Sequence, residues 1–465
     1  MLFSTIPFFE FLAVVLALYY AAPRVARRPI LLAASYFFYM SWNAKFIVLL
    51  LTLTAIDYTA ALWIARSEGH RRKLFLIVGL SGNLSFLGFF KYYNFLADNI
   101  ALLLQRPPHS FALAIILPLG ISFHTFQSMS YIIDVYRGQQ KPIRNPLDYA
   151  LFIAFFPQLV AGPIVRAREF FGDLYNWKRP VGEEVLRGVM LIGVGLAKKL
   201  AFADQFALVA DSYFSNPAAH AGALAAWKGV GAFSLQIFFD FSGYSDMAIG
   251  MALLLGFHFP QNFARPYLAF SITDFWHRWH MTLSRWLRDY LYIPLGGNRH
   301  GTLNTYRNLM LTMLLGGLWH GASWNFVAWG GYHGALLAIE RMLGRKMFED
   351  KPPMWLYPFR AALTTVLVTI GWVFFRASDF THSRYIISQM FSFAHHMPNL
   401  AVPVWLIWLA VFSVMVAIVE ERWDFFNRLA RGPAIAFIAV MIATMLMVEL
   451  FGVIDKQIPF VYFQF

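Results

Sequence analysis

The sequence predicts an all-helical, polytopic membrane protein with about 10–12 transmembrane helices and additional re-entrant or interfacial helices. Composition is the first observation behind this prediction. Of the 465 residues, 59% are hydrophobic and only 14% are charged, whereas soluble domains are roughly 45–50% apolar. The second is a mean hydropathy of +0.54. The third is that apolar runs recur along the whole chain, separated by short basic connections.

The first apolar run, residues 6–22, follows no basic residue and contains Glu10. It is therefore predicted to be a retained membrane helix rather than a removable signal peptide. Several of the remaining runs are shorter than the ~20 residues of a straight span, so half-spans are expected. The interrupted apolar piece Tyr149–Ile164, with prolines at 157 and 163, is predicted to be re-entrant or interfacial. The other crossings are predicted at residues 30–42, 46–65, 74–90, 111–133, 185–211, 224–256, 303–319, 323–340, 361–375, 402–420 and 433–453.

The formal net charge of +13 is explained by the membrane, because alternate connections between crossings hold most of the lysine and arginine residues. The positive-inside bias makes that side cytoplasmic and places both termini outside, so no nucleic-acid partner is expected. No soluble-domain-sized segment or internal repeat appears, which predicts one membrane domain over residues 1–465. The chain has no cysteine, which excludes thiolate metal sites, cysteine nucleophiles and disulfides. Adjacent His395 and His396 are expected to be solvated in an external loop.

Residues 271–299 are predicted to form an amphipathic helix on the cytoplasmic face. At about 100° per residue, one arc of this helix is apolar and the arginines face away. His280 falls at the edge of the apolar arc and is expected to point into the protein, whereas His277 is expected to face water or headgroups. A plain membrane anchor is the alternative interpretation. The apolar arc contains Trp276, Trp279, Leu283, Trp286, Leu287 and Tyr290.

One histidine, His320, lies in GLWHGASWNF between two long apolar runs. Titratable groups at bilayer depth are costly and usually face a cavity, so His320 is a candidate catalytic residue. A neutral imidazole in a dry channel is a competent general base. The alternative is a histidine that hydrogen-bonds across a helix contact. The flanking Trp319, Ser323 and Asn325 are expected to line the same cavity.

The segment FFDFSGYSDMAIG places Asp240, Tyr244 and Asp246 in an otherwise apolar crossing. The carboxylates are expected either to line the cavity or to pair with basic residues of other helices. No metal site is predicted, because the chain lacks HExxH and the several histidine boxes that di-iron membrane enzymes require. It also lacks a GxSxG elbow and a phosphate loop.

Several ordered motifs together give a resemblance to the membrane-bound O-acyltransferases, in the bacterial branch of alginate O-acetylation, with the teichoic acid D-alanyl transferases as more distant relatives. The resemblance covers most of the chain. Its motifs are PLGISFHTFQSMSYIIDVYRG (118–138), FFPQLVAGPIVR (155–166), GLAKKLAFAD (195–204), FDFSGYSDMAIG (239–250), WHMTLSRWLRDYLYIPLGGNR (279–299), GLWHGASWNFVAWGGYHG (317–334) and PFVYFQF (459–465).

The resemblance implies a helical fold around a central tunnel that joins the two membrane faces. It also implies that His320 is the intramembrane catalytic histidine and that His280, in the WHxxLSxW segment, is the second one. His277 and His124 depart from the family pattern. The expected reaction moves an acyl group, most simply acetyl, from a cytosolic thioester such as acetyl-CoA or an acyl carrier, with no bound cofactor. Arg288 and its basic neighbours suit that anionic donor.

The expected acceptor is an exported polysaccharide or peptidoglycan, reached through an SGNH-type extracytoplasmic acetyltransferase partner. This places the protein in the bacterial inner membrane. A transporter or flippase without covalent chemistry is the alternative, because broken helices near residues 316–323 would serve it equally. A di-iron oxidase is a third class, and it predicts stoichiometric iron.

Overall fold

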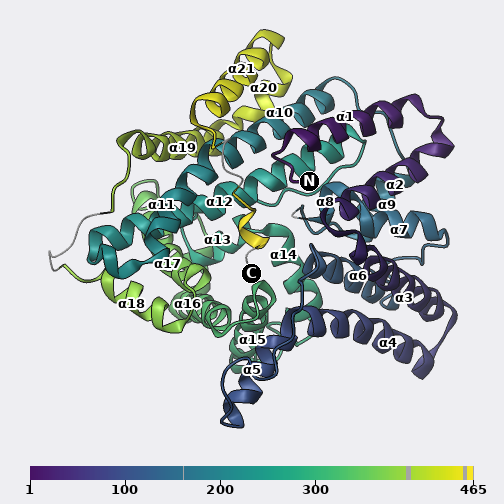
Figure 1. Ribbon diagram of the computed structural model, residues 1–465, viewed down its shortest axis with the longest axis horizontal. Coiled ribbons are helices and arrows are strands. Elements are labelled where there is room, and N and C mark those ends of the chain that lie inside the picture. Colours follow the sequence, from purple (N-terminus) through teal and green to yellow (C-terminus); the bar gives the residue numbers. More distant parts are fainter. Residues whose placement is uncertain (161, 394–399, 454–457, 464–465) are drawn as a thin grey trace. The chain divides into compact units, whose positions relative to one another are not determined.

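The structure is a computed structural model that describes residues 1–160, 162–393, 400–453 and 458–463 (Figure 1). Within those ranges every regular secondary-structure element is a helix, and no strand is present. The predicted fold class is confirmed. The prediction for His395 and His396 lies outside the described residues. The chain divides into two compact units, of which unit 1 comprises residues 1–188 and 248–260, and unit 2 comprises residues 189–247 and 261–465.

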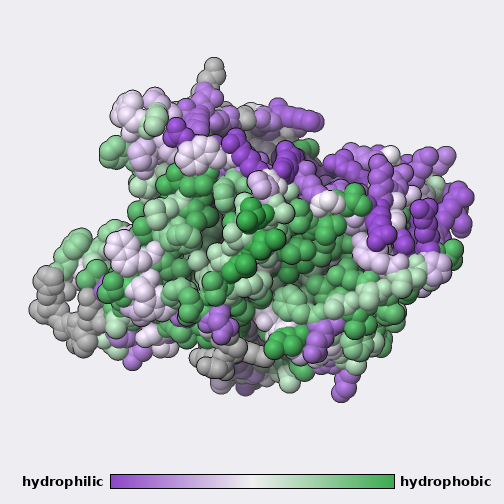
Figure 2. All heavy atoms as spheres, turned by 90° about the horizontal axis from the view of Figure 1, so that it is seen from above, coloured by the Kyte–Doolittle hydropathy of each residue, from purple (hydrophilic) through white to green (hydrophobic). Residues whose placement is uncertain are grey.

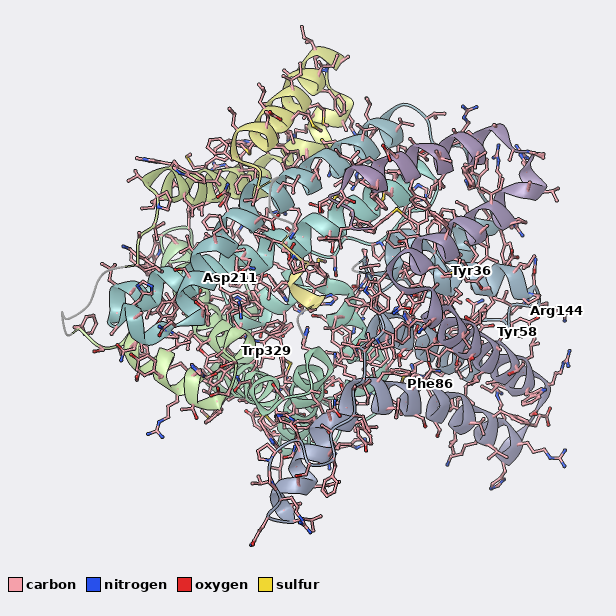
Figure 3. All side chains as sticks on the ribbon, viewed as in Figure 1. Tyr36, Tyr58, Phe86, Arg144, Asp211 and Trp329 are labelled. Carbon is pink, nitrogen blue, oxygen red and sulfur yellow. The ribbon has the colours of Figure 1, made fainter. Side chains whose placement is uncertain are left out.

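Unit 1 contains the N-terminal helices, and its predicted crossings at 6–22, 30–42, 46–65 and 74–90 are helices. Asn43 separates two of them, with φ of −160° and a side chain that accepts a hydrogen bond from the Lys45 amide. Tyr58 donates to the backbone carbonyl of Arg144 at 2.5 Å (Figure 3). The elements are α1 Ile6–Ala21, α2 Arg24–Asn43, η1 Ala44–Phe46, α3 Ile47–Arg66, α4 Gly69–Leu87, η2 Gly88–Tyr92, α5 Tyr93–Leu103, α6 Ile121–Tyr136, α7 Pro146–Ala154, α8 Phe156–Leu159 and α9 Ala167–Tyr175.

The predicted crossing at 111–133 is wrong in its first part. Residues 112–118 are not helical, and α6 begins only at Ile121. Pro118 disfavours helical backbone in the residue before it, and Gly120 adopts φ of +69°, in the left-handed region. The apolar composition of 111–120 therefore does not correspond to helix. The interrupted piece at 149–164 is broken as expected, since α7 and α8 meet at Phe155 with ψ of 112°.

Unit 2 contains the helices that carry the candidate site. Two elements, α10 Glu183–Ala197 and α12 Ala223–Leu254, contribute residues to both units. The others are η3 Lys198–Ala203, α11 Asp204–Ser215, η4 Pro217–His220, η5 Pro266–Leu268, α13 Ile272–Arg278, α14 Met281–Leu287, η6 Arg288–Tyr292, α15 Thr302–His320, α16 Trp324–Glu349, α17 Tyr357–Arg376, α18 Phe380–Met390, α19 Val404–Trp423, α20 Phe425–Arg431, α21 Ala434–Phe451 and η7 Val461–Phe463.

Glycines allow α15 and α16 to pack closely. A Cβ added at Gly317 would come within 2.2 Å of the Phe326 carbonyl oxygen, and one at Gly330 within 2.3 Å of the Met313 carbonyl oxygen. Small residues of this kind let helices in a membrane approach backbone to backbone. The contact fixes the end of α15, where His320 lies, against the start of α16.

Six helical stretches in the described residues are long and apolar enough to cross a membrane. They are Arg24–Arg66, which comprises α2, η1 and α3, and Gly69–Leu103, Ala223–Leu254, Tyr357–Arg376, Val404–Trp423 and Ala434–Phe451. The predicted crossings at 303–319 and 323–340 are helices, α15 and α16, outside those six. Hydrophobic side chains cover much of the face shown in Figure 2. These helices are those of a multi-pass membrane protein.

Candidate functional site

His320 is the last residue of α15, where Gly321 turns to extended backbone with φ of −159°. Its side chain is buried, with 4% of the residue exposed. The imidazole is enclosed by aromatic rings: the centroids of Trp319 and Trp329 are each 5.0 Å away. Figure 3 labels Trp329, which belongs to α16. Phe375 and Tyr462 complete the enclosure at 5.3 and 5.7 Å.

His280 lies at a break in the predicted helix of residues 271–299. That single helix is wrong: α13 ends at Arg278, α14 begins at Met281, and His280 adopts φ of 41° between them. Left-handed backbone at a non-glycine residue is strained and often marks a functional position. The burial prediction is confirmed, since His280 is fully buried and His277 is exposed.

Asn262 fixes the His280 ring. Its Oδ1 accepts hydrogen bonds from the Thr282 hydroxyl at 2.8 Å and from His280 Nδ1 at 3.2 Å. Because that oxygen is an acceptor, the proton of the neutral imidazole is on Nδ1. Burial lowers the pKa of His280 to about 3. The ring is therefore neutral at physiological pH, with Nε2 as its basic nitrogen.

The two imidazoles are neighbours, with ring centroids 6.5 Å apart. Trp319 borders both, at 6.2 Å from His280. Phe241 of α12 contacts His280 at 4.7 Å and Tyr462 at 4.5 Å. The sequence resemblance named both histidines, and the structure brings them into one buried aromatic cluster.

The C-terminal segment completes this cluster, a feature that the sequence analysis missed. Lys199 is buried and its Nζ contacts Asp204 Oδ1 at 2.7 Å and Asp240 Oδ1 at 3.0 Å. The same ammonium donates to the Ile458 carbonyl at 3.0 Å. Asp240 also accepts a hydrogen bond from the Val461 amide at 2.6 Å. This buried charge cluster holds the segment that presents Tyr462 to His320.

Three of the remaining predicted residues belong to α12. Asp240 and Asp246 pair with Lys199 and Lys198, as the ion-pair alternative expected. Tyr244 packs on Phe460 with centroids 4.5 Å apart.

Three further predicted residues lie in two places. Ser323 and Asn325 follow His320 in the chain, and Arg288 lies in the predicted amphipathic segment 271–299. Asn325 is buried and donates to the Ala377 carbonyl at 2.9 Å. Ser323 is half-buried between α15 and α16. Arg288 is exposed and paired with Asp289 at 2.7 Å, and it is not one of the described side chains that enclose the two histidines.

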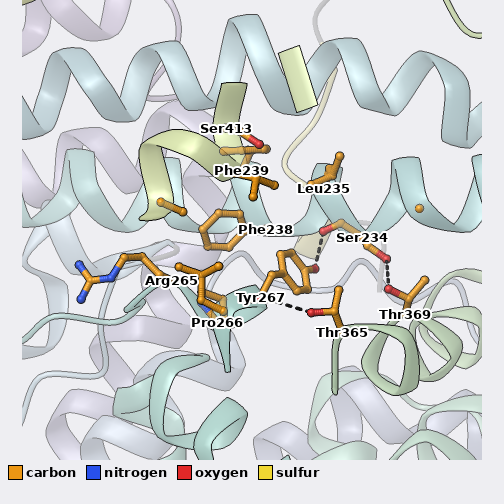
Figure 4. Close-up of a pocket in the computed structure, with 14 residues that line it drawn as sticks. Ser234, Leu235, Phe238, Phe239, Arg265, Pro266, Tyr267, Thr365, Thr369 and Ser413 are labelled. Atoms are coloured by element: carbon orange, nitrogen blue, oxygen red, sulfur yellow. Dashed lines mark hydrogen bonds between the residues drawn. The ribbon is translucent and has the colours of Figure 1, made fainter. Parts of the chain in front are cut away.

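Neither histidine lines the pocket of about 250 Å³ in unit 2 (Figure 4). That pocket lies between α12, α17 and α19, and Tyr267 spans it by donating to the Ser234 carbonyl at 2.5 Å. Its lining is mainly apolar. The expected tunnel stays a prediction. Among the described residues, no three His, Cys, Asp or Glu side chains are grouped so that they could hold a metal.

Comparison with known proteins covers the part of the chain that contains this site. The sequence model of the "MBOAT, membrane-bound O-acyltransferase family" matches residues 143–378, a range that contains both His280 and His320. The chain belongs to the membrane-bound O-acyltransferase family. As a member of this family it is a membrane O-acyltransferase.

Curated relatives of this O-acyltransferase cover most of its length. It is 46% identical over 399 residues to the "Probable alginate O-acetylase AlgI" of Pseudomonas putida, covering 84% of this chain and 81% of that protein. It is 40% identical to the peptidoglycan O-acetyltransferase of Helicobacter pylori, covering 84% and 80%. The teichoic acid D-alanyltransferase of Bacillus subtilis is 31% identical, covering 60% of this chain and 72% of that protein.

Proposed function

We propose that this O-acyltransferase moves acetyl groups from a cytosolic thioester to hydroxyl groups destined for an exported polysaccharide or peptidoglycan. The names of the relatives support acetyl, since alginate O-acetylase and peptidoglycan O-acetyltransferase share that acyl group. The single observation that carries the proposal is the pair of buried imidazoles, His320 and His280, 6.5 Å apart inside an aromatic enclosure.

In the proposed reaction His320 is the general base. Its neutral ring accepts the proton of the acceptor hydroxyl as the oxygen attacks the thioester carbonyl. The carbon–sulfur bond then breaks, and the imidazolium returns the proton to the leaving thiolate. Positioned proton transfer of this kind is worth about 10²- to 10⁴-fold in rate. His280 positions the reacting groups, because Asn262 fixes its ring and tautomer.

The donor is acetyl-CoA or an acyl carrier, and no bound cofactor is required. Both donors carry phosphates, which arginine recognises well. The basic connections around Arg285, Arg288 and Arg299 would meet such a donor on the cytoplasmic side. The acceptor step uses an extracytoplasmic partner, for which an SGNH-type acetyltransferase has the fitting chemistry.

The proposed location is the bacterial inner membrane, with both termini outside. The support is the charge distribution: lysine and arginine gather in alternate connections, and such connections stay cytoplasmic. With this orientation the thioester is available on one side of the membrane and the exported polymer on the other.

The experiment uses purified protein in defined lipid with a labelled acetyl donor. An acyltransferase forms a labelled ester on an added hydroxyl acceptor, whereas a transporter would move an intact solute and leave no ester. His320→Ala should lose transfer by about 10²-fold or more. His320→Ala at the wild-type rate would refute the assignment.

His333→Ala is the matched control. His333 is also fully buried, contacts Trp329 at 5.0 Å, and belongs to the same unit. Removing its imidazole creates a similar cavity without touching the proposed base. Both variants should lose stability, and only His320→Ala should lose transfer.

A further inference from the structure

A basic pocket of about 180 Å³ lies in unit 1, where α1 is followed by α2. Arg24, Arg27 and Arg28 line it together with aromatic side chains, and no carboxylate is among its lining residues. Three guanidinium groups within the first two turns of one helix repel one another, and an anion between them would reduce that repulsion. The aromatic walls are Tyr19, Tyr175 and Trp177.

Arg27 has hydrogen-bonding capacity left over. Its guanidinium stacks on Trp177 at 4.4 Å and lies over Tyr19 at 5.4 Å. Nε donates to the Ala22 carbonyl at 3.3 Å. Nη1 is buried and has no hydrogen-bond partner among the described residues. A buried donor without an acceptor is costly, and an anion in the pocket would satisfy it.

The aromatic walls are held in place by other groups. Tyr19 and Trp177 both donate to the Leu255 carbonyl, at 3.1 and 2.8 Å. Their polar atoms are thereby satisfied at the end of α12, and their faces remain turned to the Arg27 guanidinium. The pocket is therefore formed before any ligand binds.

One carboxylate offsets the positive charge. Arg28 Nη1 contacts Asp148 at 3.1 Å, and Asp148 is almost fully buried. Arg24 is exposed at the first turn of α2, where no side chain caps the free backbone amides. A helix N-terminus and guanidinium groups both favour a negative ligand.

The surroundings are those of a membrane surface. Val14 and Leu18 of α1 are 57% and 53% exposed, so the helix that leads to the pocket presents apolar side chains outward. Tyrosine and tryptophan at the end of such a helix are typical of the headgroup level. The pocket volume of about 180 Å³ leaves room for one phosphate group.

We propose that this pocket binds the phosphate group of an anionic phospholipid at the membrane surface. Guanidinium groups form charge-assisted N–H bonds to phosphate oxygens, and Arg27 Nη1 and the Arg24 guanidinium would each supply such a bond. The site is independent of acyl transfer. The shared ligand chemistry is the phosphate, and a soluble phosphate-bearing donor is the other source to be tested.

The test compares lipids on the purified full chain. Thermal unfolding and native mass spectrometry are followed during titration with phosphatidylglycerol or with zwitterionic phosphatidylcholine. Phosphatidylglycerol should raise the unfolding midpoint and remain bound. In Arg24→Gln/Arg27→Gln its apparent affinity should fall at least tenfold. The matched control is Arg66→Gln/Arg71→Gln, which removes two exposed arginines at the end of α3 and the start of α4 and should behave as wild type.

Several outcomes would overturn the proposal. Equal affinity in the pocket variant and the wild type would do so, as would equal retention of the two lipids. Coenzyme A and inorganic phosphate are the soluble ligands of the test. If coenzyme A displaces phosphatidylglycerol and raises the unfolding midpoint in its place, the pocket binds a soluble phosphate compound and the proposed lipid ligand is wrong. If the double variant does not fold, exposed Arg24→Gln alone should still weaken binding several-fold, and unchanged binding there refutes the site.

Discussion

Lys199 and Asp240 form a buried ion pair 3.0 Å long, and Asp240 also accepts the backbone amide of Val461. Two helical segments and the C-terminal segment are thereby joined at one charge cluster. Because Tyr462 follows Val461 and borders His320 at 5.7 Å, the cluster connects a structural contact to the proposed catalytic base.

Lys199→Met is expected to destabilise the protein strongly. It leaves Asp204 and Asp240 as buried carboxylates without their cation, a change that costs about 3–5 kcal/mol at other buried pairs. The neighbouring Lys198→Met is the control, because Lys198 is 25% exposed in its pair with Asp246; pairs that reach solvent are worth about 1 kcal/mol or less. Thermal unfolding in detergent measures both, and equal losses would contradict the account.

The same variant should release the C-terminal segment. The chain has no cysteine, so a single Val461→Cys reporter is the only thiol. Val461 is fully buried, and maleimide should label the reporter slowly. In the Lys199→Met background labelling should accelerate at least tenfold at a temperature where the protein stays folded, and an unchanged rate would show that the cluster does not hold the segment.

Tyr462→Phe should lower acyl transfer without lowering stability. The Tyr462 hydroxyl is buried and has no hydrogen-bond partner among the described residues. Removing such a group costs the fold little, whereas the hydroxyl of a ring that borders His320 can bond to reacting groups. Tyr213→Phe is the control. Tyr213 belongs to α11, and its hydroxyl is also buried without a hydrogen-bond partner among the described residues. Loss of transfer in both variants, or in neither, would argue against a role for Tyr462.

Gly330→Ala should impair both stability and transfer. The added methyl group would meet the Met313 carbonyl oxygen at 2.3 Å and push α16 from α15, and overpacking of this kind costs about 1–3 kcal/mol. Gly331→Ala provides a neighbouring control, because its nearest contact would be an ordinary 3.5 Å to a Leu314 methyl. Unfolding midpoints and transfer rates that rank the two variants in the opposite order would refute this packing.

Stability should fall in mild acid because of His280. The pKa of this imidazole is lowered from 6.5 to about 3 by burial. The unfolded chain therefore binds a proton below pH 6.5 that the folded protein refuses until about pH 3, and the free energy of unfolding decreases with falling pH through that window. His280→Gln should show a shallower loss between pH 7 and 5 than wild type. Exposed His277→Gln should keep the wild-type slope, and identical slopes in all three proteins would contradict the buried neutral ring.

The sequence alone predicted the helices that consist of one uninterrupted apolar run. Residues 47–66 form α3 because the run is uninterrupted between Asn43 and Ser67. Helical periodicity also predicted that His280 points into the protein and that His277 faces outward. Periodicity could not reveal the break between α13 and α14, because left-handed backbone at a histidine has no local signature and depends on the hydrogen bonds of Asn262.

The environment of His320 was only partly predictable. Trp319 is adjacent in the chain, but Tyr462 reaches the ring through a segment held by Lys199 and Asp240. A hydrogen bond between residues 221 positions apart follows from tertiary packing alone. From the sequence, Asp240 is expected either to line the cavity or to pair with a basic residue, and no pattern in the sequence connects it to the C-terminal segment.

The most direct test of the central claim is the single-turnover rate of acetyl transfer by folded His320→Gln, with donor and acceptor saturating. If His320 is the base, the chemical step should slow by about 10²- to 10⁴-fold while donor binding, measured separately, stays within twofold. A chemical step at the wild-type rate in a variant that binds donor normally would contradict the claim.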